Sequence, residues 1–98
     1  MSTSKLEFLS SLESIIVARM QDPSAESYTA SLVAKGPKHI AQKVGEEAVE
    51  LAIASVDGDR HATVSEAADL VYHLLVLLNN QGITLSEVAA ELESRHTG

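Results

Sequence analysis

Four acidic residues in the middle of the chain lie inside apolar stretches of helical period. With successive residues about 100° apart around a helix, Glu66 and Asp69 fall among the leucine positions of one segment. Glu47 and Glu50 share a face of the preceding segment, most of whose remaining circumference is alanine, valine and isoleucine. Helices that are apolar nearly all round are usually buried, and an unpaired, ionised carboxylate is costly to bury. The chain must therefore fold so that something positive meets these carboxylates.

Apolar residues recur every three or four positions along most of the chain, which predicts helices. Thr84 and Glu87 have the spacing of a capping box, and Asp59 or Thr63 is suited to cap the preceding helix. Gly45 is expected to permit close approach of another helix. With short links and no strand alternation, we expect an all-α, antiparallel bundle of four to five helices. The expected helices run from about Leu9 to Asp22 or Pro23, from 27 to 33 with Gly36 as the stop, from 38 to 56, from the cap to Leu78 with Gly82 as the stop, and from 85 to 94.

The length and charge of the chain exclude several classes of protein. Its 98 residues fit a single domain, which we expect to span residues 1–98, and the formal net charge of -7 argues against a nucleic-acid partner. The longest apolar stretch, Ala67 to Leu78, contains Asp69 and His73 and is well short of the roughly 20 residues that span a membrane. Residues 1–9 lack the features of a secretory signal. We therefore expect a soluble, cytoplasmic protein without membrane contacts, which covers its excess apolar surface by forming a homodimer.

Each central segment offers two carboxylates three residues apart, about one helical turn, so two facing antiparallel helices would bring all four together. Four oxygen donors, in a chain without cysteine, suit Mg²⁺ or Mn²⁺ better than Zn²⁺. A di-iron site would need a histidine three residues after Glu50 or Glu66, and neither position has one. Because Mg²⁺ keeps positions open for phosphates, the expected ligand is a phosphate ester or anhydride. The alternative is that these carboxylates form a solvated, salt-bridged helix face. The leucine neighbours of Glu66 and Asp69 argue against that alternative.

The acidic residues also form a motif. Glu46-Glu47-Ala48-Val49-Glu50, followed by Glu66-Ala67-Ala68-Asp69, is similar to the motif of the MazG-like all-α nucleotide pyrophosphohydrolases. With the segments 27–32, 35–36, 40–50 and 66–74, the chain resembles the phosphoribosyl-ATP pyrophosphatase family from about Phe8 to His96. The resemblance implies a homodimeric enzyme that hydrolyses phosphoribosyl-ATP to phosphoribosyl-AMP and pyrophosphate with Mg²⁺, the second step of histidine biosynthesis.

Two other functions remain open from the sequence. A MazG-type housecleaning enzyme that hydrolyses nucleoside triphosphates would share every metal ligand, and only the segment 27–43 separates it from the first interpretation. A non-catalytic helical oligomerisation module would show no metal dependence.

The acidic site residues divide into two overlapping groups. The expected metal ligands are Glu47, Glu50, Glu66 and Asp69. The expected catalytic residues are Glu46, Glu47 and Glu50. Glu46 points about 100° away from Glu47, so it either orients the attacking water or hydrogen-bonds a metal ligand.

The expected substrate-binding residues are Lys35, Lys38, Lys43 and His73. The lysines are concentrated just before the carboxylates of the long helix, where they would contact phosphates; the alternative is ordinary surface lysines. His73 lies one turn beyond Asp69 and is expected either to bind substrate, to hydrogen-bond a ligand carboxylate, or to be a hydrogen-bonded core histidine. Tyr72 is expected to pack or to contact a second subunit.

Overall fold

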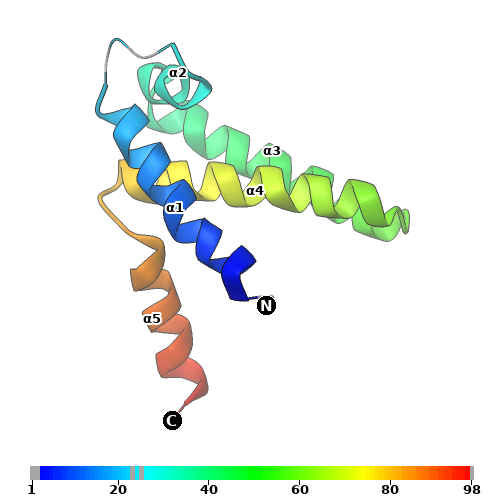
Figure 1. Ribbon diagram of the computed structural model, residues 1–98. Coiled ribbons are helices and arrows are strands. Elements are labelled where there is room, and N and C mark those ends of the chain that lie inside the picture. Colours follow the sequence, from blue (N-terminus) through cyan, green and yellow to red (C-terminus); the bar gives the residue numbers. More distant parts are fainter. Residues whose placement is uncertain (1–2, 23, 25, 98) are drawn as a thin grey trace.

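The computed structural model describes residues 3–22, 24 and 26–97, with side chains from Lys5 onward, and in these residues it contains five helices and no strand (Figure 1). The helices are α1 (Thr3–Met20), α2 (Tyr28–Lys35), α3 (Pro37–Val56), α4 (Arg60–Asn80) and α5 (Leu85–His96). The predicted all-α class is confirmed.

The long helices α3 and α4 lie side by side and antiparallel, and their contact is the most extensive between any two elements (Figure 1). A tight turn with Gly58 at a φ of 75° reverses the chain between them. Helices α1 and α2 pack across one end of this pair. Four helices therefore share one core, whose fully buried residues are Ile16, Leu32, Ile40, Leu75 and Val76.

Helix α5 extends away from the other four helices (Figure 1). Its first residue, Leu85, packs at the margin of the core. The carboxylate of Glu13 on α1 accepts hydrogen bonds from the backbone N–H of Leu85 at 2.8 Å and from Nδ2 of Asn79 on α4 at 2.9 Å. Glu13 thus holds the start of α5 from another helix, because the first N–H groups of a helix have no partner within it.

The predicted caps are local, and most are confirmed. Thr84 and Glu87 form the reciprocal capping box of α5. Asp59 caps α4 by accepting from Ala62 N at 3.0 Å, whereas the Thr63 hydroxyl donates to the Asp59 carbonyl and is not the cap. Gly36, at a φ of 100°, separates α2 from α3.

Four predicted ends differ from the structure: α2 continues to Lys35, α4 continues to Asn80, and the ends of α1 and α5 also differ. Helix α1 ends at Met20 because the Asp22 carboxylate accepts from both the N–H and the hydroxyl of Ser24, which forms a turn; Pro23 lies outside the described residues. Helix α5 continues past Ser94 to His96, where the basic residues of its last turn favour helix.

The expected close approach at Gly45 is wrong for the described chain. A Cβ atom built there would meet nothing within 4 Å, because this side of α3 is exposed. The same outer surface carries the exposed apolar residues Val49, Ile53, Val56 and, from α4, Val64. In the described residues, no helix combines the length and the apolar character that a membrane span requires.

Candidate metal and phosphate site

The carboxylates of α3 and α4 meet across the interface between these helices. Glu47 of α3 and Glu66 and Asp69 of α4 each place one oxygen so that the three oxygens lie within 4.8 Å of one another. Glu47 is buried with 7% of its surface exposed, Glu66 is half-buried, and Asp69 is exposed. Carboxylate oxygens are the ligands that hard divalent cations prefer, so these residues could hold such an ion.

Glu50 differs from the other expected ligands. It is exposed, lies outside the group of three, and is adjacent to Glu66. A hydrogen bond to Glu50 is the largest influence that raises the pKa of Glu66, followed by burial and by the charges of Glu50, Asp69 and Glu47. The expected four-way convergence is therefore found for three residues, with Glu50 beside one of them. The rotation of α3 that turns Glu47 toward Asp69 and Glu66 leaves Glu50 outside the group and beside Glu66.

Lys43 supplies the positive charge nearest to these carboxylates. Its Nζ lies 3.5 Å from Glu47 Oε2, one turn further along α3, and 3.6 Å from Glu46 Oε1. Both distances exceed the 2.7–2.9 Å of a strong charge-assisted hydrogen bond, so the ammonium is held loosely. The proximity of Tyr28 is the largest influence that raises the pKa of Lys43, and Glu47 and Glu46 act in the same direction.

Glu46 lies beside Lys43 and not among the three converging carboxylates. Its Oε2 accepts a hydrogen bond from Gln42 Nε2 at 3.0 Å. That hydrogen bond is the largest influence that lowers the pKa of Glu46, and Lys43 adds to it. Glu46 is thus an ionised hydrogen-bond acceptor at the exposed edge of the site.

The other two expected lysines are not brought to the carboxylates. Lys35 ends α2 and Lys38 lies in the first turn of α3, and both are exposed. In the part of the chain that the structure describes, Lys43 is the lysine that forms ion pairs. Of the three lysines predicted to bind phosphate, Lys43 therefore lies at the carboxylates, whereas Lys35 and Lys38 lie at the surface.

His73 is buried, with 6% of its surface exposed, and both of its ring nitrogens have partners. Nδ1 lies 2.7 Å from the backbone carbonyl oxygen of Asp69, and Nε2 lies 2.8 Å from the hydroxyl oxygen of Tyr28. The expected hydrogen bond to a ligand carboxylate is wrong, since the partner is the backbone of that ligand. The third alternative, a hydrogen-bonded core histidine, is what the structure contains, and substrate contact by His73 stays a prediction.

Tyr28 is a neighbour of the site that the sequence reasoning missed. Its ring stacks on Tyr72, with centroids 5.9 Å apart, and meets the ring of His73 edge to face at 5.6 Å. Partial burial raises the pKa of Tyr28, Lys43 opposes this, and Glu47 and Asp69 add to it. The available signal was composition, since Tyr28 is one of two tyrosines in a chain with 3% aromatic residues.

Tyr72 packs, as expected. Its ring contacts the core and stacks on Tyr28, and its hydroxyl hydrogen-bonds the hydroxyl of the buried Thr29. It therefore belongs to the contact between α2 and α4.

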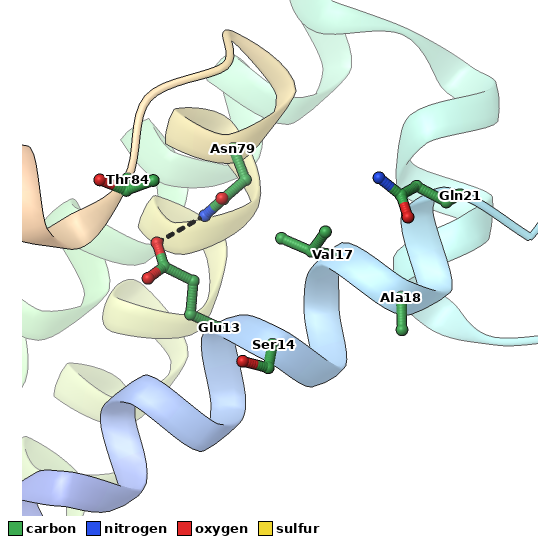
Figure 2. Close-up of a pocket in the computed structure, with 7 residues that line it drawn as sticks. All are labelled: Glu13, Ser14, Val17, Ala18, Gln21, Asn79 and Thr84. Atoms are coloured by element: carbon green, nitrogen blue, oxygen red, sulfur yellow. Dashed lines mark hydrogen bonds between the residues drawn. The ribbon is translucent and has the colours of Figure 1, made fainter.

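Two hollows differ in their chemistry. One, of about 340 Å³, opens beside the carboxylates and is lined by Glu50, Ile53, Ala54, Asp57, Asp59, Ala62 and Glu66. The other, also about 340 Å³, lies between α1 and the end of α4, where Glu13 and Asn79 are already hydrogen-bonded to each other (Figure 2). The first hollow adjoins the carboxylates that could hold a metal ion and offers room for a ligand.

The sequence is similar to proteins of one known family. Residues 9–96 match the family described as phosphoribosyl-ATP pyrophosphohydrolase. A phosphoribosyl-ATP pyrophosphatase of Methylobacterium nodulans is 57% identical over 91% of this chain and 83% of its own, and one of Pyrobaculum neutrophilum is 51% identical over 91% and 95%. A histidine biosynthesis bifunctional protein of Photobacterium profundum is 52% identical over 93% of this chain, which spans only 44% of that relative. The chain belongs to the phosphoribosyl-ATP pyrophosphohydrolase family.

Proposed function

We propose that this chain hydrolyses phosphoribosyl-ATP to phosphoribosyl-AMP and pyrophosphate, the second step of histidine biosynthesis. Family membership and the names of relatives matched over most of their length support this activity. The observation that carries the proposal is the meeting of Glu47, Glu66 and Asp69 from two helices. Such a cluster is suited to neutralising a polyphosphate through a divalent cation. We also propose that the protein acts in the cytoplasm, as expected from the sequence.

The donor set fits Mg²⁺, with Mn²⁺ as the alternative. Every side chain of the cluster offers carboxylate oxygen, which is the ligand that these hard cations prefer. Glu47, Glu66 and Asp69 would hold the ion, and Glu50 would complete the set from beside Glu66. When bound, the ion would neutralise charge on the phosphates and help to generate a nucleophile from water.

The other residues of the site act on the phosphates and on the water. Lys43, loosely held at 3.5 Å from Glu47, is free to bind a phosphate oxygen. Glu46, ionised and hydrogen-bonded by Gln42, would keep the ammonium at the site and, from its exposed position, would orient the attacking water. The exposed Lys35 and Lys38 would act at longer range, by attracting the anionic substrate.

The proposal includes a homodimer. Val49, Ile53 and Val56 of α3 are 59%, 57% and 86% exposed, and Val64 of α4 is 62% exposed, so large apolar side chains of both helices face outward. Surfaces of this kind on small chains are commonly covered by a second subunit. Because the hollow beside Glu50 and Glu66 includes Ile53, the second subunit would also shield the site from water.

The test is pyrophosphate release by the purified protein with phosphoribosyl-ATP or with a panel of nucleoside triphosphates, with and without Mg²⁺. We expect Mg²⁺-dependent turnover of phosphoribosyl-ATP well above that of any common triphosphate. Turnover of triphosphates at an equal or higher rate would replace the proposal by the housecleaning alternative, and no metal-dependent turnover of any substrate would favour the oligomerisation module.

Two variants and one control address the metal ligands. Glu50→Gln and Glu66→Gln should each lower activity at least about 100-fold and weaken Mn²⁺ binding measured by electron paramagnetic resonance. The matched control is Glu91→Gln, which removes an exposed carboxylate of α5 that pairs with Arg95. It should leave both activity and Mn²⁺ binding unchanged. Full activity in Glu50→Gln would remove Glu50 from the ligand set.

A further inference from the structure

Tyr28 is a half-exposed aromatic side chain that is held by two neighbouring rings. It begins α2, and 50% of its surface is exposed. One face of its ring stacks on Tyr72, with the centroids 5.9 Å apart and the planes inclined by 28°. The ring of His73 meets it edge to face, with the centroids 5.6 Å apart. Because Tyr72 covers one face of the ring, the exposed half of Tyr28 includes the opposite face.

A hydrogen bond also fixes the direction in which the Tyr28 ring points. Nδ1 of the neutral His73 ring lies 2.7 Å from the backbone carbonyl oxygen of Asp69, which can only accept, so Nδ1 donates that bond. Nε2 accepts the hydroxyl proton of Tyr28 across 2.8 Å. With its hydroxyl and one face engaged, the ring has little freedom left to lose when a ligand binds to its open face.

The same hydrogen bonds place Tyr28 near the carboxylate cluster. Asp69, whose backbone accepts from His73, is one of the three residues whose carboxylate oxygens converge. Two hydrogen bonds and one imidazole ring separate the Tyr28 hydroxyl from the Asp69 backbone. That span is similar to the ribose and ester linkage between the base and the first phosphate of a nucleotide. A nucleotide whose phosphates lie at the carboxylates can therefore reach Tyr28 with its base.

An open aromatic face beside a phosphate site is suited to a nucleobase. Every base has a π face, and the stacking of a base on an aromatic side chain contributes to binding. The chain has only three Phe and Tyr residues. Tyr72 is partly buried against the core, and Phe8 lies on α1, which contributes no residue to the carboxylate cluster. Tyr28 is therefore the aromatic residue that is placed to meet a base.

We propose that Tyr28 is a substrate-binding residue whose open ring face stacks on the adenine of phosphoribosyl-ATP, with Tyr72 behind the ring and His73 holding its hydroxyl. This inference rests on the proposed function, and it assigns contact with the base to α2. The carboxylates bind the phosphates through the cation, whereas Tyr28 binds the other end of the nucleotide. The stack favours purines over pyrimidines, because purines have the larger π face.

The kinetic test is Tyr28→Leu, which replaces the ring by an apolar side chain without a π face. Loss of the stack should raise KM for phosphoribosyl-ATP about tenfold, with kcat within about twofold, because stacking stabilises the bound substrate and the transition state equally. The matched control is Phe8→Leu, which removes a ring of similar exposure, 55%, from α1 and should leave KM unchanged. An unchanged KM in Tyr28→Leu would overturn the proposal.

A second variant separates the ring from its hydroxyl. Tyr28→Phe keeps the ring and its stacking on Tyr72 and loses the hydrogen bond to His73. It should keep KM within about threefold of the wild type, even where thermal unfolding shows a lower Tm. An increase of KM as large as that of Tyr28→Leu would mean that the hydroxyl and not the ring face matters, and the stacking proposal would be wrong.

A direct test needs no turnover. AMP has the base but no anhydride bond to hydrolyse, and ribose 5-phosphate has no base. In NMR spectra of the wild type with Mg²⁺, AMP should shift the ring protons of Tyr28 upfield and give nuclear Overhauser effects between the adenine and that ring. Ribose 5-phosphate should do neither. No contact between adenine and the Tyr28 ring in excess AMP, as expected if a second subunit covers the ring, would overturn the proposal.

The stacking proposal and the proposed function can fail separately. If AMP stacks on Tyr28 and the wild type does not hydrolyse phosphoribosyl-ATP, the proposed function fails and the base-binding role of Tyr28 stands. If the wild type hydrolyses phosphoribosyl-ATP and Tyr28→Leu leaves KM unchanged, the stacking proposal alone fails.

Discussion

One carboxylate oxygen of Glu13 joins three helices. Oε2 accepts from Asn79 Nδ2 at 2.9 Å (Figure 2) and from the backbone N–H of Leu85 at 2.8 Å. Helix α5 extends from the rest of the fold, so this contact and the packing of Leu85 attach it. The negative charge at the start of α5 also interacts favourably with the helix dipole.

The expected magnitudes follow from these two bonds. A hydrogen bond to a charged group contributes about 1.5 kcal/mol at the lower end of its range, which suits a half-buried carboxylate, so Glu13→Ala should lower the free energy of unfolding by about 3 kcal/mol. Glu13→Gln keeps one acceptor oxygen for both donors and loses only the charge, which should cost about 1 kcal/mol. For a chain of this size, these losses correspond to decreases in Tm of roughly 15 °C and 5 °C.

Urea unfolding followed by circular dichroism measures both values, at one fixed protein concentration because a dimer would make stability depend on it. Hydrogen exchange should show that Glu13→Ala lowers protection most in the first turn of α5. The control is Glu91→Ala, which breaks the exposed pair with Arg95 and should cost less than about 0.5 kcal/mol. Equal losses in Glu13→Gln and Glu13→Ala, or a loss below about 0.5 kcal/mol in Glu13→Ala, would refute the hydrogen-bond reasoning.

Three further predictions concern the site, the interface and the core. The hydrogen bond that protonated Glu66 donates to Glu50 raises the pKa of Glu66, and burial and the nearby carboxylates act in the same direction. The folded state therefore resists ionisation of Glu66, and the metal-free protein loses stability as pH rises past the ordinary glutamate range. Glu66→Gln should therefore be more stable than the wild type in EDTA at about pH 7, with the difference vanishing near about pH 4; a difference that does not change with pH contradicts this account. Ile53→Lys should give a monomer in sedimentation with unchanged helix content, and a dimer of wild-type stability would place the interface elsewhere. Leu75→Ala, at a fully buried position, should lower the free energy of unfolding by about 3 kcal/mol in urea titration, and a loss below about 1 kcal/mol would mean that the site collapses around the cavity.

Features that depend on neighbours in sequence could be predicted well. The Thr84 and Glu87 box and the Asp59 cap each involve groups three residues apart, so the sequence contains both partners. The meeting of Glu47 with Glu66 and Asp69 also follows from local rules, because a short turn makes α3 and α4 antiparallel neighbours and helical spacing fixes the faces. The resemblance of these acidic residues to the family motif adds the expectation that the cluster binds Mg²⁺ and takes part in hydrolysis of a nucleotide.

Features that depend on packing between distant segments could not be predicted. Tyr28 and His73 are 45 positions apart, and Glu13 and Leu85 are 72 apart, so their hydrogen bonds exist only after α1 and α2 have packed against α4. The same limit applies to Glu50, whose place beside Glu66 depends on a rotation of α3 that a helical wheel leaves free. In the described residues no helix faces Gly45, and the sequence could not reveal this, because a helical wheel identifies a small residue without indicating whether another helix packs against it.

The sequence by itself determined the helices, their caps and the acidic cluster, because these follow from backbone geometry and from residue spacing along one or two adjacent helices. Only the tertiary structure decided which lysine reaches the carboxylates and which groups hydrogen-bond the two ring nitrogens of His73. Those properties depend on which hydrogen-bonding groups are brought within about 3 Å of one another, and packing of the whole core sets such distances.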